Sequence, residues 1–233
     1  KVTYLYHSGF MVETNNYCLV FDYYTAGGKF NNIDLTAFKG KNVFVFVSHA
    51  HQDHYDKEIF KWKGENIRYV LSKDCRYDSS IENVTAVLPN KGYIIDGLAL
   101  ETLKSTDEGV AFVVHADGLA IYHAGDLNWW HWEGEPDSYN EHMKTAYLKE
   151  IEKLKDTPID VAFVPVDPRL GEQYYYGIDG FAKRVDAKAL IPMHCWGDYT
   201  VCEKLMHQEV TKEYRERIYP ITKEGEEICL KIS

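Results

Sequence analysis

Short apolar and alternating segments dominate the first half of the chain and predict a series of β-strands. Residues 42–48 contain the run VFVFV without polar alternation, so they predict a central strand that is buried on both faces. The pair Asp117-Gly118 between two apolar segments is a strong signal for a tight hairpin. The predicted strands are residues 2–6, 10–14, 17–22, 42–48, 68–71, 85–88, 93–95, 98–103, 110–115 and 119–124.

The second half of the chain changes to a mixture of helices and strands. Residues 138–156 have helical spacing, with Met143, Tyr147, Ile151 and Leu154 along one stripe. No stretch rich in Pro, Gly or Ser separates the two halves, so we expect residues 1–233 to form a single domain of class α/β or α+β. The other predicted elements are helices at 181–185 and 201–215 and strands at 161–166, 189–193 and 228–232.

Charge and cysteine content narrow the classes of function. The 233 residues carry 26 Lys and Arg against 36 Asp and Glu, a net charge of −10 that argues against binding bare nucleic acid or anionic membrane. The five cysteines have no C-x-x-C spacing, so we expect neither a redox dithiol nor a zinc ribbon, and a reduced, cytoplasmic location. No apolar run approaches the roughly 20 residues that a membrane helix needs.

A dense group of metal-binding residue types follows the predicted central strand. The segment SHAHQDH at 48–54 brings three histidines and an aspartate together. Imidazole nitrogens and carboxylate oxygens suit zinc and its neighbours in the periodic table. His49 and His51 project to one side of an extended chain, and a loop at the end of a buried strand is a rigid place for a site. The alternative is an ordinary solvated polar turn.

The pattern H-x-H-x-D-H after a buried strand resembles the signature of the metallo-β-lactamase superfamily, and the resemblance extends over nearly the whole chain. It includes HSGF at 7–10, the strand-terminal Asp22, YHAGD at 122–126 and PMH at 192–194, in the order of the family. The resemblance implies a four-layer αββα sandwich with metals at one edge. The single-domain, lactonase-like hydrolases look most similar, because the YHAGD and PMH segments resemble those of the sugar-phosphate lactonase relatives.

The resemblance also implies a set of metal ligands. Transferred position by position, the first metal takes two histidines, the second metal takes an aspartate and two histidines, and one aspartate bridges both ions. In that order the ligands are His49 and His51, then Asp53, His54 and His194, then Asp126.

This sequence departs from the family at the third histidine of the first metal. His115 is the only histidine between His54 and His123, and it lies at the wrong end of its strand pair. We expect Asp107 to supply an oxygen ligand instead, with Glu108 or Thr106 next. A carboxylate in place of an imidazole hardens the site and favours manganese or iron relative to zinc. A single metal held by the second-metal ligands and Asp126 is the alternative.

These observations predict a metal-dependent hydrolase that uses one or two divalent ions, zinc first, with manganese or iron as alternatives. Divalent ions lower the pKa of bound water and polarise a carbonyl or phosphoryl oxygen. Asp53 is the candidate to orient the nucleophile or take its proton. The expected substrate is a small, anionic molecule with an ester, lactone, amide or phosphodiester bond. A non-catalytic metal- or ligand-binding module is the alternative, supported by the departure at 105–108.

Several further residues are candidates for the surroundings of the metals. His7 lines the metal edge or makes a structural hydrogen bond, and Asp22 orients a ligand imidazole. In the segment NWWHW at 128–132, we expect Trp129 and Trp130 to be packed, and His131 and Trp132 to lie near the pocket. Trp196 has a similar pocket interpretation. Arg169 binds an anionic group or forms a surface ion pair. His123 touches substrate or lies satisfied in the core, and His115, His142 and His207 are surface residues.

Overall fold

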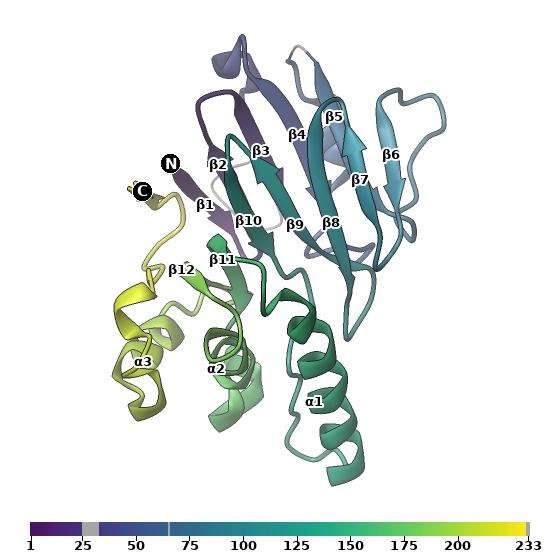
Figure 1. The fold of residues 1–233 in the computed structure, drawn as a ribbon. Helices are drawn as coiled ribbons and strands as arrows, with labels where there is room; N and C mark the ends of the chain where they lie inside the picture. The colour runs from purple at the N-terminus through teal and green to yellow at the C-terminus, as the bar shows by residue number, and fades with distance from the viewer. Residues whose placement is uncertain (25–32, 65, 232–233) are drawn as a thin grey trace.

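The structure is a computed structural model that describes residues 1–24, 33–64 and 66–231. Two twisted β-sheets face each other (Figure 1). The first sheet has the strand order β13-β1-β2-β3-β4-β5-β6, and the second has the order β12-β11-β10-β9-β8-β7. The strands of the first sheet are β1 (Val2–Tyr6), β2 (Gly9–Glu13), β3 (Tyr17–Phe21), β4 (Asn42–Val47), β5 (Ile67–Ser72), β6 (Val84–Val87) and β13 (Glu227–Ile228). Those of the second are β7 (Gly92–Ile95), β8 (Leu98–Lys104), β9 (Val110–Ala116), β10 (Leu119–His123), β11 (Ile159–Pro165) and β12 (Ala187–Met193).

Each sheet contains a block of parallel strands, and this arrangement creates the edge that carries the chemistry. In the first sheet β3, β4, β5 and β6 run parallel, and in the second β10, β11 and β12 run parallel. Because the carboxyl ends of parallel strands lie at the same edge, the loops after β3, β4, β10, β11 and β12 collect there. Residues that are far apart in the sequence are therefore brought to one place.

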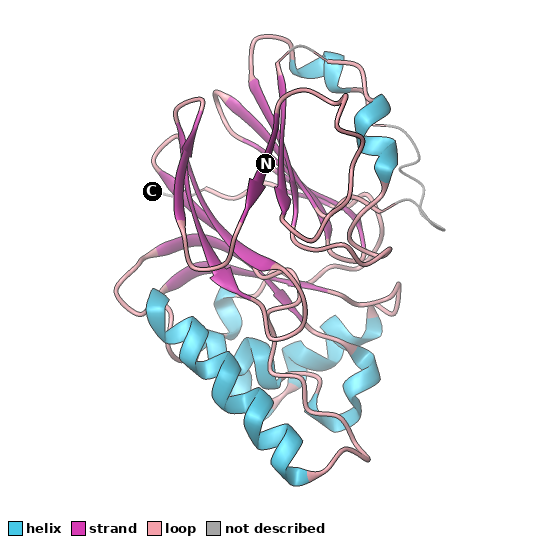
Figure 2. Cartoon of the chain, turned by 90° about the vertical axis from the view of Figure 1, so that its right-hand side faces the viewer, coloured by secondary structure: helices cyan, strands magenta, loops and turns pink. Residues whose placement is uncertain are grey.

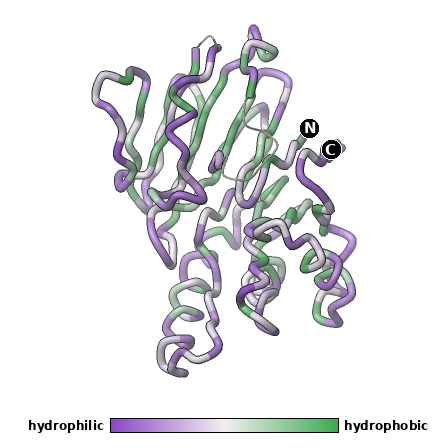
Figure 3. Tube along the Cα trace, turned by 180° about the vertical axis from the view of Figure 1, so that it is seen from behind, coloured by the Kyte–Doolittle hydropathy of each residue, from purple (hydrophilic) through white to green (hydrophobic). Residues whose placement is uncertain are grey.

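The strand β4 is buried on both faces, as its uninterrupted apolar pattern predicts. Phe44 and Phe46 point into the core between the sheets, where the ring of Phe46 lies 5.3 Å from that of Phe112. Val45 and its neighbours at alternate positions belong to a second core on the outer face of the first sheet. The strands of both sheets accordingly carry most of the hydrophobic colour in Figure 3. Burial on both faces makes β4 a rigid support for the loop that follows it.

Helices cover the outer faces of the two sheets (Figure 2). On the second sheet lie α1 (Asp137–Ile151), α2 (Tyr176–Ala182) and α3 (Thr200–His207), whose apolar residues join the core of that sheet. On the first sheet lie the 3-10 helices η1 (Leu35–Phe38) and η2 (Lys57–Lys61), through Leu35 and Ile59. The predicted four-layer αββα sandwich is confirmed. None of the helices in the described ranges is long and apolar enough to cross a bilayer.

The Asp117-Gly118 hairpin is also confirmed. Ala116 pairs with Leu119 across a two-residue turn, in which Asp117 and Gly118 have φ angles of 51° and 79°. Both residues are in the left-handed region that such a turn demands. The carboxylate of Asp117 accepts hydrogen bonds from the backbone N–H of Asn16 at 2.8 Å and from Thr14 Oγ1 at 2.7 Å. The turn therefore ties the second sheet to the first.

The position of the short helix predicted at 181–185 was wrong. The observed helix α2 spans Tyr176–Ala182. Gly177 and Gly180 weaken the local helical signal, because glycine costs up to about 1 kcal/mol in a helix. Packing excludes a Cβ at Gly177 and leaves little room for one at Gly180. A Cβ at Gly177 would lie 1.8 Å from Asn128 Oδ1, and one at Gly180 would lie 3.3 Å from the ring of Tyr147.

The two predicted C-terminal elements are shorter than expected. The helix predicted at 201–215 ends at His207 and is followed by the 3-10 turns η5 (Glu209–Thr211) and η6 (Arg215–Arg217). The Thr211 hydroxyl donates to the carbonyl oxygens of Leu205 and Gln208 and so satisfies the end of the helix. Of the strand predicted at 228–232, only Ile228 pairs, together with Glu227, and residue 232 lies outside the described residues.

Candidate metal centre

Four of the predicted ligands converge in the interior of the shared edge. They come from the loop after β4, the loop after β10 and the end of β12. His49, His54, Asp126 and His194 are all buried. Asp126 is at their centre, since its Oδ1 lies 3.1 Å from His54 Nε2 and 3.2 Å from His194 Nε2. Its Oδ2 lies 3.6 Å from His49 Nε2. One carboxylate oxygen of Asp126 therefore faces two imidazole rings and the other faces a third, as a bridging carboxylate would.

Buried carboxylates orient these imidazole rings through Nδ1. Asp22 Oδ2 lies 2.7 Å from His54 Nδ1 and accepts a hydrogen bond of 2.6 Å from the Ser48 hydroxyl. Ser48 Oγ in turn lies 2.9 Å from His49 Nδ1, so it accepts from that ring. These bonds place a proton on Nδ1 of both rings and turn Nε2 of each ring toward Asp126, where a neutral ring can bind a metal through it. Asp22 thus occupies the orienting position expected for it.

Asp167 orients His194 in the same way, and the sequence analysis missed it. Its Oδ2 lies 2.9 Å from His194 Nδ1, and the carboxylate is fully buried. The available signal was its position just after the apolar strand β11, with Val166 between, which is similar to the position of Asp22 after β3. The Arg169 guanidinium donates hydrogen bonds to the Asp167 carboxylate from Nε and Nη2, and Nη2 lies 2.6 Å from Oδ2.

The unpartnered polar atoms of the cluster fit a cation. Among the described residues, the Nε2 atoms of His49, His54 and His194 and Oδ1 of Asp126 are buried without a hydrogen-bond partner. A buried polar group without a partner costs about 1–3 kcal/mol. Ligands that lie about 2.1 Å from one ion are about 3.0–3.5 Å from each other, which matches the 3.1 Å and 3.2 Å separations at Asp126 Oδ1. The donors present therefore suit a divalent metal.

Asp53 and His7 extend the cluster on the side of His54 and His194. Asp53 Oδ2 lies 3.7 Å from His54 Nε2 and 3.9 Å from His194 Nε2. It also lies 3.2 Å from Nε2 of His7, which comes from the turn between β1 and β2. One ligand atom from each of these four residues lies within 4.8 Å of the others. The predicted second-metal ligands are thus together, with His7 added.

The opposite side of Asp126 is more open. His51 is half-exposed, and its Nδ1 lies 3.8 Å from Asp107 Oδ2. His51, Asp107 and Asp126 form one group of neighbouring donors, whereas His49 groups with His54 and Asp126. Glu108 Oε2 is 3.5 Å from His51 Nε2. The expected ligands of a first metal therefore surround Asp126, but they do not form one compact group.

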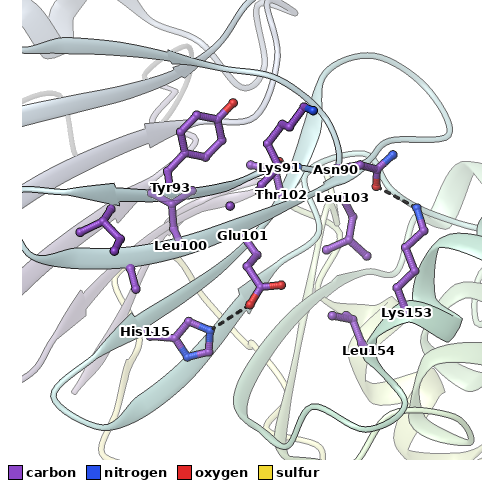
Figure 4. Close-up of a pocket in the computed structure, with 13 residues that line it drawn as sticks. Asn90, Lys91, Tyr93, Leu100, Glu101, Thr102, Leu103, His115, Lys153 and Leu154 are labelled. Carbon is purple, nitrogen blue, oxygen red and sulfur yellow. Dashed lines mark hydrogen bonds and ion pairs between the residues drawn. The ribbon is translucent and has the colours of Figure 1, made fainter.

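Thr106, the remaining candidate for this position, is engaged elsewhere, and His115 lies away from the cluster, as expected. The Thr106 hydroxyl donates to the Asn128 carbonyl at 2.7 Å, so it is occupied by the backbone. His115 lies on β9, 3.8 Å from Glu101, in a groove of about 670 Å³ that is lined by β7–β9 and by Lys153 and Leu154 of the 3-10 turn after α1 (Figure 4). This groove contains none of the clustered donors.

Electrostatics in the cluster follow from burial and from the carboxylates. Burial lowers the pKa of His7 to about 3 and that of His49 to about 4, so both rings are neutral at pH 7. Burial also disfavours the charged form of His54, but Asp126 and Asp22 outweigh it and raise the pKa of His54. Burial raises the pKa of Asp126, yet His54 and His194 hold that pKa well below its usual value.

A cavity of about 610 Å³ opens onto Asp53, Asp107, Asp126 and His194. Tryptophans form much of its wall. Alternate residues of the 129–132 segment point to opposite sides, so two of the four side chains face the cavity and the other two face away from it. Trp130 and Trp132 stack with their ring centroids 5.8 Å apart and line the cavity. Trp129 and His131 both lie against Tyr176 on the other side, at 5.1 Å and 5.5 Å.

Trp130 is packed in the core as expected but also lines the cavity, whereas His131 lies away from the cavity, contrary to the expectation. Trp130 lines the cavity and also donates from Nε1 to the Asp126 carbonyl at 3.0 Å, so it holds the backbone of the central ligand. Trp196 lines the cavity as expected, with Arg169 stacked 4.7 Å from its ring. Among the remaining histidines, His142 lines the cavity rather than only the surface. His123 is a satisfied core residue, bonded to the Ser8 carbonyl at 2.8 Å.

Comparison with known sequences finds relatives that match most of the chain. A UPF0173 metal-dependent hydrolase of Anoxybacillus flavithermus is 26% identical over 220 residues, which cover 83% of this chain and 85% of that protein. A UPF0173 metal-dependent hydrolase of Pyrococcus abyssi is 26% identical over 219 residues, which cover 83% and 84%.

Solved structures share the fold. Igni18, a metallo hydrolase of Ignicoccus hospitalis, superposes with a TM-score of 0.65 at 16% identity and covers 100% of this chain and 98% of its own. The isothiocyanate hydrolase from Delia radicum gut bacteria has a TM-score of 0.56 at 14% identity, with 98% of both chains covered. The sequence pattern of the beta-lactamase superfamily domain matches residues 1–133, which include β1–β10, the H-x-H-x-D-H segment and Asp126. This chain therefore belongs to the beta-lactamase superfamily.

Proposed function

We propose that this protein is a metal-dependent hydrolase that cleaves an ester, lactone, amide or phosphodiester bond in a small, anionic substrate. The observation that carries the proposal is the set of buried, unpartnered Nε2 atoms that surround the Asp126 carboxylate. Such a set is costly unless a cation occupies it. The relatives named as metal-dependent hydrolases support the same class of chemistry.

The residues divide the work between metal binding and substrate binding. A divalent ion held by these side chains would polarise the scissile group and lower the pKa of water. His49, His51 and Asp107 would hold one ion, His54, His194 and Asp53 the other, and Asp126 both. Asp53 lies at the cavity wall, where it can orient the attacking water or accept its proton. Both sheets supply ligands to the same cluster, so we treat residues 1–233 as one hydrolase domain.

Arg169 supports an anionic substrate. Its Nε and Nη2 atoms bond Asp167, and its guanidinium lies 4.7 Å from the ring of Trp196 and 5.5 Å from that of Trp132. These contacts hold the positively charged guanidinium at the cavity wall in one orientation, with Nη1 on the side away from Asp167. An Arg guanidinium recognises carboxylate and phosphate groups through such donors. The stacked indoles offer a flat apolar surface beside it for a ring of the substrate.

Turnover separates this function from a non-catalytic metal-binding module. Protein stripped with a chelator should be inactive toward a panel of esters, lactones, amides and phosphodiesters, each in an anionic and a neutral version. Addition of Zn²⁺, Mn²⁺ or Fe²⁺ should restore hydrolysis, with the anionic member of a pair preferred. Metal-dependent stabilisation without hydrolysis of any substrate would favour the binding module. Absence of metal binding would contradict both.

Asp107 provides a specific test of the first-metal site. Asp107→Ala should weaken the binding of one metal equivalent by at least about tenfold and leave the other equivalent in place, because one oxygen donor is lost. Elemental analysis and isothermal titration measure this effect. Asp156→Ala is the control, since Asp156 is an exposed aspartate outside the cluster, and it should change the affinity by less than about threefold. Unchanged metal content in Asp107→Ala would remove Asp107 from the ligand set.

A further inference from the structure

His7 differs from the other buried histidine outside the predicted ligand set. His123 is equally buried, and both of its ring nitrogens are satisfied, Nε2 by the Ser8 carbonyl and Nδ1 by the Gly125 N–H at 3.2 Å. In the part of the chain that the structure describes, neither ring nitrogen of His7 has a hydrogen-bond partner. A structural histidine in a core follows the pattern of His123. His7 does not, so a structural hydrogen bond fails to explain it.

The backbone holds His7 in an unfavourable conformation at this point. His7 occupies the tight turn between β1 and β2, where Tyr6 pairs with Gly9, and its φ angle is 54°. A left-handed φ is uncommon for a residue other than glycine and collects at functional sites. The His7 carbonyl also accepts a hydrogen bond of 3.1 Å from the backbone N–H of His194. The turn is thus tied directly to a predicted metal ligand.

The His7 ring lies among the donors of the second-metal group. Its centroid is 4.0 Å from that of His194 and 5.6 Å from that of His54. Its Nε2 lies 3.2 Å from Asp53 Oδ2 without forming a directed hydrogen bond. That separation falls within the range of about 3.0–3.5 Å between two ligands of one ion. The ring of Trp196 closes the other side of the imidazole, at 4.2 Å.

We propose that His7 is an additional ligand of the second metal, through Nε2, beyond the set that the superfamily resemblance implies. The inference rests on the proposed function, because it requires that a metal binds at this edge. The ion would then have five protein donors, from His7, Asp53, His54, His194 and Asp126. Five protein donors would leave few open positions on this ion.

His7 as a metal ligand and His7 as a positioning partner of Asp53 predict different behaviour of two variants. His7→Ala removes both roles. His7→Gln keeps an N–H donor for Asp53 but removes the imidazole. If His7 is a ligand, both variants should lower the affinity for the tightest equivalent of Zn²⁺ by about 100-fold or more, since a directly bound donor exceeds the 10–100-fold effect of an outer partner. Competition with a chromophoric chelator measures this affinity, and His115→Ala is the control for loss of an exposed histidine.

X-ray absorption on protein loaded with one equivalent of Zn²⁺ decides between the two roles. The wild-type protein should show three imidazoles per zinc, and His7→Gln should show two. An unchanged number of imidazoles in His7→Gln would overturn the proposal, whatever the change in affinity. Wild-type protein that binds none of Zn²⁺, Mn²⁺ and Fe²⁺ would instead contradict the proposed function. Thermal unfolding in the presence of chelator checks that each variant folds, and His7→Gln serves alone if His7→Ala does not.

Discussion

Asp126→Ala should abolish binding of at least one metal equivalent and reduce kcat/KM on the preferred substrate by about a thousandfold or more. Its carboxylate faces His54 and His194 with one oxygen and His49 with the other, so its removal takes a ligand from both sides of the cluster. A bound metal supplies several kcal/mol of transition-state stabilisation, and each 1.36 kcal/mol is a factor of about ten in rate. We expect no neighbouring side chain to replace this carboxylate, because His49, His54 and His194 are all arranged around it.

Elemental analysis and steady-state kinetics measure this loss. Asp126→Asn is the informative companion, because it keeps the size of the side chain and one carbonyl oxygen but loses the charge, and it should retain at most one equivalent. Asp156→Ala is the matched control. Asp156 is an exposed aspartate that precedes β11, at the opposite end of the strands from the cluster. Retention of two metal equivalents with less than a tenfold change in kcat/KM for Asp126→Ala would contradict the bridging role.

Gly109→Ala should destabilise the fold by about 2–5 kcal/mol and also weaken metal binding. Gly109 has a φ angle of +70°, and a Cβ there would lie 2.0 Å from the Ser48 carbonyl oxygen and 2.6 Å from the Cβ of His49. The left-handed conformation costs about 1–2 kcal/mol for a residue with a Cβ, and overpacking adds about 1–3 kcal/mol. The clash involves backbone, which cannot turn aside. Relief requires the loop that carries Asp107 to separate from the start of the H-x-H-x-D-H segment.

Gly97→Ala provides the control for the conformational part of this cost. Gly97 has a φ angle of +86°, and nothing lies within 4 Å of the added Cβ. Its substitution should therefore cost only about 1–2 kcal/mol. Urea unfolding of both variants in the presence of chelator measures the difference without a contribution from metal. Equal free energies of unfolding for the two variants would show that the approach of Gly109 to Ser48 is not a tight contact.

The strands and the ligand-bearing loop were predictable because their signals are local. The period of apolar residues, the run 43–47 and the Asp117-Gly118 turn each act through neighbouring residues, and the structure confirms them. The helix α2 was misplaced because contacts with Asn128 and Tyr147, far along the chain, outweigh the low helical propensity of its glycines. Asp167 was missed for a related reason, since its partner His194 is 27 residues away.

The sequence by itself determined the class of chemistry, because three histidines and an aspartate within six residues after a buried strand have few other uses. It also determined the family, through motifs in a characteristic order. Only the tertiary structure decided which donors lie close together and which way each ring faces. It also placed the His7 ring beside Asp53 instead of in a structural hydrogen bond in the core. These properties depend on how the parallel strands of two sheets align their carboxyl ends. That alignment results from packing between residues distant in sequence, and no local pattern encodes it.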